Sequence, residues 1–263
     1  MKAIRPAPGL ISRRRLLGIG SAAAGASLLA GCSVVPGPYQ LRKFFAGAEW
    51  LTLRSQRALL SGAPLAAEFT AADISPTFRA NGTTLPDDAG YQNMASDDFV
   101  NWRLEVGGLV ERPLSLSLAE LRQLPARTQI TRHDCVEGWS CIGKWKGPML
   151  STILDRVALK PEARYIVFHC ADKLGYSFLA SQYYESIDLI DAFHPQTILA
   201  YEMNDAELPV KHGAPLRLRV ERQLGYKMAK YVMQIEAVDS LTGLGEGNGG
   251  YWEDQGYEWY AGI

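Results

Sequence analysis

The sequence has 263 residues, a formal net charge of −1 and an apolar fraction of 47%. This length is enough for one large domain or two small ones with a buried core, and the apolar fraction is that of a globular protein. The near-zero charge provides no electrostatic basis for binding a nucleic acid, so we exclude that class of partner.

The first 31 residues have the pattern of an export signal. The basic stretch Arg13-Arg14-Arg15 is followed by an uncharged run rich in Ala, Gly and Leu that ends at Gly31. This run is shorter than the roughly 20 residues that a membrane span needs. The arginine pair after Ser12 favours the twin-arginine route, which exports folded proteins, over an ordinary secretory signal. We therefore expect a location in the periplasm or cell envelope.

The apolar run ends in Leu29-Ala30-Gly31-Cys32, which resembles the lipobox of bacterial lipoproteins. In that case Cys32 is acylated and holds the protein on a membrane surface without spanning it; an ordinary cleavage site is the alternative. Three cysteines then remain, at positions 135, 141 and 170. In an oxidising compartment an odd number leaves at least one thiol of a monomer unpaired.

The expected elements after the signal are short, and most of them are strands. A surface helix is expected over 39–62, and mostly loop over 61–95. Strands are expected over 102–108, 114–118, 127–134, 164–170, 197–203, 215–220 and 231–238, and short helices over 119–124 and 149–157. The tail from Gly243 is Gly-rich and then aromatic. Because strands outnumber helices, the expected fold class is α+β with mixed β-sheets and short helices.

The stretch RHDCVEGWSC, residues 132–141, concentrates reactive groups. Cys135 and Cys141 have no second pair at zinc-finger spacing, and a Cys-x-x-Cys redox motif is absent. A Cys–His hydrolase using Cys135 is an alternative, although no helix-opening signature surrounds it. Cys141 and Cys170 either form a disulfide or are two buried free thiols. On an alternating strand, His133 and Cys135 face the same side.

Two segments carry a resemblance to a known family. DCVEGWSCIGKWKG (134–147) and HGAPLRLRVERQLGYKMAK (212–230) resemble the molybdopterin domain of the sulfite oxidase superfamily, in particular the bacterial branch that includes periplasmic methionine sulfoxide reductases. The resemblance covers residues 81–263, with 1–31 as signal peptide and 32–80 as anchor, surface helix and linker. It implies a sulfite-oxidase-type molybdopterin-binding fold and one molybdenum with one molybdopterin. Cys135 is then the catalytic thiolate ligand, a soft donor that suits this metal.

The same resemblance implies cofactor contacts outside the second segment. Asn81, in FRANG, matches a residue that opens the cofactor pocket, although an Asn before Gly is also an ordinary turn residue. His133 is expected near the metal or the pterin, with a hydrogen-bonded core histidine as the alternative. Cys170 falls where a relative places a Thr against the pterin, and simple packing is its alternative role.

The second segment matches the part of the family site that binds the phosphate end of the pterin. Arginine offers a planar fork that suits phosphate. Lys230 matches a final lysine that meets the cofactor, and Lys227 is a weaker candidate. A solvated edge is the alternative interpretation of these basic residues. The candidates are His212, Arg217, Met228, Ala229 and Lys230.

Departures from the family bear on the substrate. Sulfite oxidases follow the ligand cysteine with a segment whose arginine helps to bind sulfite, whereas Glu137 and Trp139 follow Cys135 here. A carboxylate at this place repels a dianion, so sulfite is disfavoured. The aromatic residues expected either in the pocket or in the core are Trp139, Trp145, Trp252, Tyr257 and Trp259.

The resemblance implies two-electron oxygen-atom transfer, most directly the reduction of a sulfoxide or related oxide on a small molecule or a protein. Electrons are then expected from a b-type or c-type cytochrome, because the chain lacks the Cys-x-x-Cys-His haem motif. One alternative is a sulfite-oxidase-like dehydrogenase that passes electrons to a cytochrome. The other is a non-catalytic surface lipoprotein that reuses the fold.

Overall fold

The computed structural model describes residues 38–59, 64–175 and 181–263. The expected signal peptide, including the arginine pair, and Cys32 lie outside the described residues. The chain separates into two units, Met1–Leu51 and Thr52–Ile263. The helix α2 (Pro38–Leu59) matches the helix expected over 39–62. In the described part of the chain, no helix has the length and apolar character needed to cross a bilayer.

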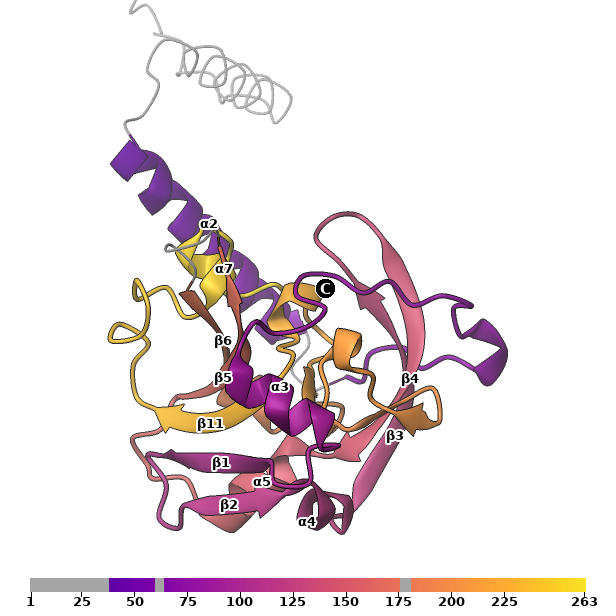
Figure 1. Cartoon of the computed structure of the whole chain (residues 1–263). Coiled ribbons are helices and arrows are strands. Elements are labelled where there is room, and N and C mark those ends of the chain that lie inside the picture. Colours follow the sequence, from indigo (N-terminus) through magenta and orange to yellow (C-terminus); the bar gives the residue numbers. More distant parts are fainter. Residues whose placement is uncertain (1–37, 60–63, 176–180) are drawn as a thin grey trace, which may run out of the picture. The chain divides into compact units, whose positions relative to one another are not determined.

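The larger sheet of the second unit has five strands in the order β2-β1-β11-β5-β6 (Figure 1). β1 (Arg103–Gly108) is parallel to β11 (Val232–Val238). β2 (Leu114–Ser117), β5 (Tyr165–Leu174) and β6 (Ser181–Asp188) pair antiparallel with their neighbours, so the sheet is mixed. Burial alternates along β1, which is typical of a strand with one face on the core.

The second sheet is built on a hairpin. β3 (Ala126–Asp134) and β4 (Ser140–Pro148) pair over their whole length, and β8 (Glu202–Met203) and β9 (Ala206–Glu207) extend the sheet. β7 (Ile198–Ala200) pairs separately with β10 (Arg217–Arg219). The strand expected over 197–203 is therefore divided between two sheets. Figure 1 shows the β3–β4 hairpin on the opposite side of the domain from β5, β6 and β11.

The helices are short, as expected. They are α3 (Ala89–Ser96), α4 (Leu118–Arg122), α5 (Leu150–Val157), α6 (Leu189–Ala192) and α7 (Tyr251–Asp254), with 3-10 turns η2 (Ala71–Asp73), η4 (Val210–His212) and η5 (Gly225–Lys227). α4 begins with a reciprocal capping box between Ser117 and Glu120. The segment expected to be mostly loop over 61–95 contains α3 near its end, which follows the cap residue Asp88 and buries only Tyr91. Because α3 buries a single side chain, its sequence has no apolar periodicity from which a helix could be predicted.

Three strands had no counterpart among the expected elements, namely β4, β6 and the two-residue β9. β6 was missed because its buried positions include the polar residues Glu185 and Ser186, which break the apolar pattern. β4 was missed because Gly and Lys interrupt its sequence. The sheets and helices nevertheless give an α+β fold with mixed β-sheets, which confirms the expected fold class.

Candidate active site

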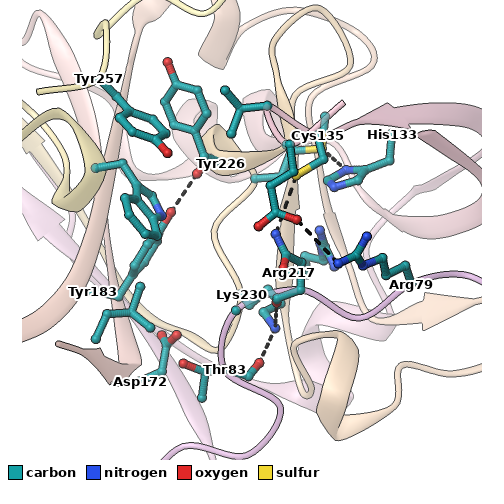
Figure 2. A pocket seen from close by; sticks show the side chains of 18 of the residues that line it. Arg79, Thr83, His133, Cys135, Asp172, Tyr183, Arg217, Tyr226, Lys230 and Tyr257 are labelled. Carbon is teal, nitrogen blue, oxygen red and sulfur yellow. Dashed lines mark hydrogen bonds and ion pairs between the residues drawn. The ribbon is translucent and has the colours of Figure 1, made fainter. Parts of the chain in front are cut away.

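One pocket collects most of the residues that the sequence predicts for the site (Figure 2). It encloses about 800 Å³, counting the part that is open to solvent. The predicted residues that line it are Asn81, His133, Cys135, Arg217, Met228 and Lys230. These residues come from four separate stretches of the chain, which the fold brings to one place.

Cys135 is placed by the turn that joins β3 to β4. Its backbone N–H donates to the carbonyl of Trp139 at 2.9 Å, and the N–H of Gly138 donates to the carbonyl of Cys135 at 3.0 Å. Gly138 has φ +83, a left-handed conformation that glycine adopts without steric cost. The strand thus ends at Asp134, and the half-buried thiol of the next residue lines the pocket together with His133, as strand alternation predicts.

The thiol of Cys135 accepts a hydrogen bond from Asn81, and its raised pKa keeps it protonated in the absence of a metal ion. The amide Nδ2 of Asn81 lies 3.5 Å from the Sγ atom. Burial raises the pKa of the Cys135 thiol, and the nearby Glu137 carboxylate adds to the shift, while the Asn81 hydrogen bond opposes it. A metal ion on the sulfur would deprotonate it outright.

Arg217 and Lys230 are cations without a carboxylate partner in the described chain. Arg217 donates from Nη1 to the carbonyl of His212 at 3.1 Å and lies over the Trp145 ring, but its buried Nε atom has no partner. Lys230 donates to the carbonyls of Asn81 at 2.8 Å, Lys211 at 3.3 Å and Thr83.

Burial and neighbouring cations lower the pKa values of both groups. Burial lowers the pKa of Arg217 to about 9, with the neighbouring Arg219 adding to the effect. Burial and the charge of Arg217 lower the pKa of Lys230 to about 7. Buried unpaired charges are costly, and cations in this state favour an anionic ligand.

His133 is a buried neutral ring. Its Nδ1 atom lies 3.1 Å from Nη1 of Arg219 and 3.2 Å from the sulfur of Met228. Burial lowers the pKa of His133 well below its usual value, and the charges of Arg217 and Arg219 act in the same direction. Because Arg219 donates to Nδ1, the neutral ring carries its proton on Nε2. His133 is thus a buried, hydrogen-bonded side chain that also lines the pocket, and its nearness to a metal or pterin stays a prediction.

Three predicted cofactor residues do not reach this pocket. The buried ring of His212 meets Phe78 edge-on at 5.6 Å, and burial lowers its pKa to about 4. The thiol of Cys170 lies within β5 and is buried. Ala229 is buried, and its carbonyl accepts from the N–H of Leu218. Cys170 and Ala229 belong to the hydrophobic core, and His212 lines a separate hollow beside Phe78 and Pro209, so the direct contact of these three residues with a cofactor stays a prediction.

Cys135, Cys141 and Cys170 are all free thiols. The disulfide between Cys141 and Cys170 is therefore not formed, and the alternative of free thiols holds. Cys141 is half-buried rather than buried, and its sulfur lies near the carbonyl of Thr77.

Several lining residues were missed by the sequence reasoning, namely Arg79, Thr83, Asp172, Tyr183 and Tyr226. Arg79 lies 3.7 Å from Glu137 and over the Trp139 ring, which in turn donates to Glu137 at 3.0 Å. The sequence feature that could have identified Arg79 is its position in the FRANG segment, two residues before Asn81. Arg132 and Lys144, the other cations near the motif, pair instead with Asp134 and Asp205.

Asp172 is the buried carboxylate of the pocket. Its Oδ1 atom has no hydrogen-bond partner, and burial raises its pKa from 3.8 to about 6. The sequence offered little indication of Asp172 as a site residue, because it lies two residues after Cys170 near the end of a strand that is predicted to be buried.

The residues fit a molybdenum–molybdopterin cofactor. Cys135 is the one cysteine that lines the pocket and offers one soft ligand, and the cations Arg217 and Lys230 offer a place for a phosphate. The unpartnered Nε of Arg217 and Oδ1 of Asp172 are further donor and acceptor atoms for a polar ring system. Among the described side chains, no three His, Cys, Asp or Glu residues form a metal cluster.

The fold and the site define a molybdopterin-binding oxidoreductase domain. Residues 90–242 match the family described as "Oxidoreductase molybdopterin binding domain", and the chain belongs to this family. The sulfite-oxidase-type resemblance and the molybdenum–molybdopterin cofactor that it implied are thereby confirmed.

The relatives include two bacterial proteins. The chain is 42% identical over 173 residues to a protein of Azospira oryzae provisionally named protein-methionine-sulfoxide reductase subunit YedZ1, covering 66% of this chain and 60% of that protein. It is 32% identical over 238 residues to the protein-methionine-sulfoxide reductase catalytic subunit MsrP of Ralstonia nicotianae, covering 86% of this chain and 69% of the relative. The match thus spans well under the full length of the Azospira protein.

A solved structure is also similar. The sulfane dehydrogenase SoxCD from Paracoccus pantotrophus matches 54% of this chain and 39% of its own chain, with 23% identity and a TM-score of 0.47.

Proposed function

We propose that this protein is an exported molybdenum–molybdopterin oxidoreductase that reduces a sulfoxide or a related neutral oxide. The main observation in support of the proposal is that one pocket is lined by the Cys135 thiol and by Arg217 and Lys230, two cations that have no carboxylate partner in the described chain. The names of the Azospira and Ralstonia relatives support methionine sulfoxide, free or in a protein, as the kind of substrate.

Each role follows from a position in the pocket. Cys135 would hold the metal, and the Asn81 amide at 3.5 Å orients the sulfur through a hydrogen bond. Arg217 and Lys230 would bind the phosphate of the pterin. When bound, the cofactor supplies the two-electron chemistry at oxygen, and the chain supplies orientation and electrostatics.

Reduction of the substrate requires electrons from a separate donor. A sulfoxide takes up two electrons and two protons and gives a thioether and water. We propose a b-type or c-type cytochrome as the electron donor, because the sequence has no haem motif of the c-type.

The carboxylate of Glu137 in the pocket is evidence against the alternative that the protein oxidises sulfite. Its hydrogen bond from Trp139 lowers the pKa of the carboxyl, so the group is ionised at neutral pH. A carboxylate beside Cys135 disfavours a dianion. Arg79, 3.7 Å from Glu137, is the one observation in favour of sulfite, because a cation at the pocket edge attracts anions.

The location is a proposal from the N-terminal sequence. The twin-arginine pattern supports export of a folded, cofactor-loaded protein, and the lipobox supports an anchor at Cys32 on a membrane surface.

The proposal is tested on protein purified from a host that makes the cofactor. We expect about one molybdenum per chain, and turnover of methionine sulfoxide with a reduced viologen dye as electron donor. Loaded protein that reduces neither methionine sulfoxide nor other S- and N-oxides would contradict the proposed activity. Protein that takes up no molybdenum would favour the non-catalytic alternative.

A further inference from the structure

The C-terminal segment, residues 243–263, lies beyond the family match and still forms part of the pocket. The match ends at residue 242. Trp252 and Tyr257 line the same pocket as Cys135. The segment therefore adds side chains to the site that the matched part of the domain does not contain.

Aromatic side chains form one side of the pocket, which we call the aromatic wall: Tyr183, Tyr226, Trp252 and Tyr257. Trp252 and Tyr257 are stacked, with ring centroids 5.2 Å apart and planes at 26°. Tyr257 meets Tyr226 edge to face at 5.2 Å. Figure 2 shows three of these rings, those of Tyr183, Tyr226 and Tyr257, across the pocket from Cys135, Arg217 and Arg79.

A buried ion cluster fixes the wall to the domain. The Nζ atom of Lys227 lies 2.5 Å from Glu185 of β6 and 2.5 Å from Glu253 of the C-terminal segment, and all three side chains are buried. Lys227 follows Tyr226, and Glu253 follows Trp252. The cluster therefore ties together the two stretches that carry the wall.

Hydrogen bonds make the wall rigid. Tyr183 donates from its hydroxyl to the carbonyl of Tyr226 at 2.6 Å, and Tyr226 donates to the carbonyl of Glu258 at 2.6 Å. Asp254 accepts from Tyr184 at 2.7 Å and from the N–H of Glu246 at 3.0 Å. A wall held at this many points is preorganised, so a ligand loses little free energy in ordering it.

The two sides of the pocket differ in charge. The wall has no charged side chain, whereas Arg79, Arg217 and Lys230 lie on the other sides. An aromatic surface gains free energy when it covers apolar area, and the gain grows with the area covered. A small anion has no apolar group to place against the wall.

We propose that the aromatic wall binds the apolar substituent of the substrate, and that Trp252 and Tyr257 thereby determine specificity for neutral sulfoxides with a bulky apolar group. This inference rests on the proposed sulfoxide reduction. It assigns to the C-terminal segment a role in selecting the substrate, while the matched domain holds the cofactor.

The test uses a ligand that binds without reacting. Methyl phenyl sulfone carries the apolar groups and a neutral oxide but is more oxidised at sulfur than the sulfoxide, and its binding to the cofactor-loaded protein is measured by calorimetry. We expect Trp252→Ala and Tyr257→Ala each to weaken binding about 10-fold, the scale of one apolar contact in a pocket. Trp252→Phe keeps an aromatic ring and should remain close to the parent protein. Ile263→Ala is the matched control, because Ile263 is an exposed apolar residue of the same segment that does not line the pocket.

Turnover provides the second measurement. For methyl phenyl sulfoxide we expect KM to rise about 10-fold in both alanine variants, while kcat/KM for the smaller dimethyl sulfoxide changes less than about threefold. Equal sulfone affinity in the parent and the alanine variants overturns the inference, and so does a parent protein that does not bind the sulfone. If the variants lose sulfone binding but no oxide is reduced by any form, the proposed function fails and the wall assignment stands. Because the Tyr257 side chain is 39% exposed, we expect Tyr257→Ala to fold, and it tests the wall even if Trp252→Ala does not fold.

Discussion

The Nδ2 atom of Asn81 lies 3.5 Å from the Sγ atom of Cys135, across 54 residues of sequence. The contact joins the loop that precedes α3 to the turn between β3 and β4. Lys230 adds a third segment, because its Nζ atom donates to the Asn81 carbonyl at 2.8 Å. A thiol, an amide and a cation are thus placed together by tertiary structure.

Cys135→Ser is expected to abolish oxide reduction while the domain stays folded. The hydroxyl fills nearly the same space but is a hard, weakly acidic ligand where the metal needs a soft thiolate. The measurements are turnover and circular dichroism. Cys141→Ser is the matched control, because Cys141 is a free thiol six residues away that does not line the pocket. Equal loss of activity in both variants would point to a site built on two cysteines.

Arg217→Met is expected to reduce the cofactor content of the purified protein at least about 10-fold. A charge-assisted bond to phosphate contributes about 1.5 to 3 kcal/mol, and the buried Nε atom has no other partner. Molybdenum and released pterin are measured per chain. Arg132→Met, which removes an exposed arginine paired with Asp134, should leave both contents unchanged. Full cofactor content in Arg217→Met would remove Arg217 from the binding site.

Asp172→Asn is expected to stabilise the cofactor-free protein at pH 8 by about 3 kcal/mol and to have little effect at pH 3. Burial raises the Asp172 pKa from 3.8 to about 6, so the folded state holds its proton more tightly than the unfolded state. That favourable contribution is complete below pH 4 and is lost as the pH rises through 6. The measurement is the free energy of unfolding in urea as a function of pH. A constant difference between the two proteins at all pH values would show that Asp172 is not perturbed.

Sulfite oxidation by the parent protein is expected to be at least about 10-fold less efficient than methionine sulfoxide reduction, measured as kcat/KM, which corresponds to about 1.4 kcal/mol. Glu137→Gln should narrow this gap, because it removes the negative charge beside Cys135 and leaves Arg79 unopposed. Glu207→Gln removes a carboxylate that pairs with Arg122 away from the pocket, and should not change the ratio. Efficient sulfite oxidation by the parent protein would falsify the role given to Glu137.

Replacing Arg13 and Arg14 together by Lys is expected to leave precursor in the cytoplasm, because a chain that has folded around its cofactor needs the folded-protein route. Cell fractionation measures this outcome. Normal export of the double variant would argue against a cofactor loaded before export. Cys32→Ala should release a soluble periplasmic form, and unchanged membrane fractionation would mean that lipid at Cys32 is not the anchor.

Local sequence was sufficient for those parts of the fold that depend on near neighbours. Alternation over 127–134 predicted β3 and the shared orientation of His133 and Cys135, since side chains on a strand repeat every two residues. The apolar spacing over 149–157 predicted α5 for the same kind of reason. β6 was not predictable in this way, because its buried Glu185 is compensated by Lys227, a residue 42 positions away.

The residues of the site also fall into those that local sequence identified and those that only tertiary structure revealed. The sequence by itself, through two local segments that resemble the family, marked Cys135 as the candidate ligand thiol and Arg217 and Lys230 as cations near a cofactor. Only the tertiary structure decided that the side chains of His212, Cys170 and Ala229 do not line this pocket, that Arg79 and Asp172 do, and that Trp252 and Tyr257 complete it. The physical reason is that the direction of a side chain is set by packing and by buried charge pairs between distant segments, and neither leaves a periodic pattern in the sequence.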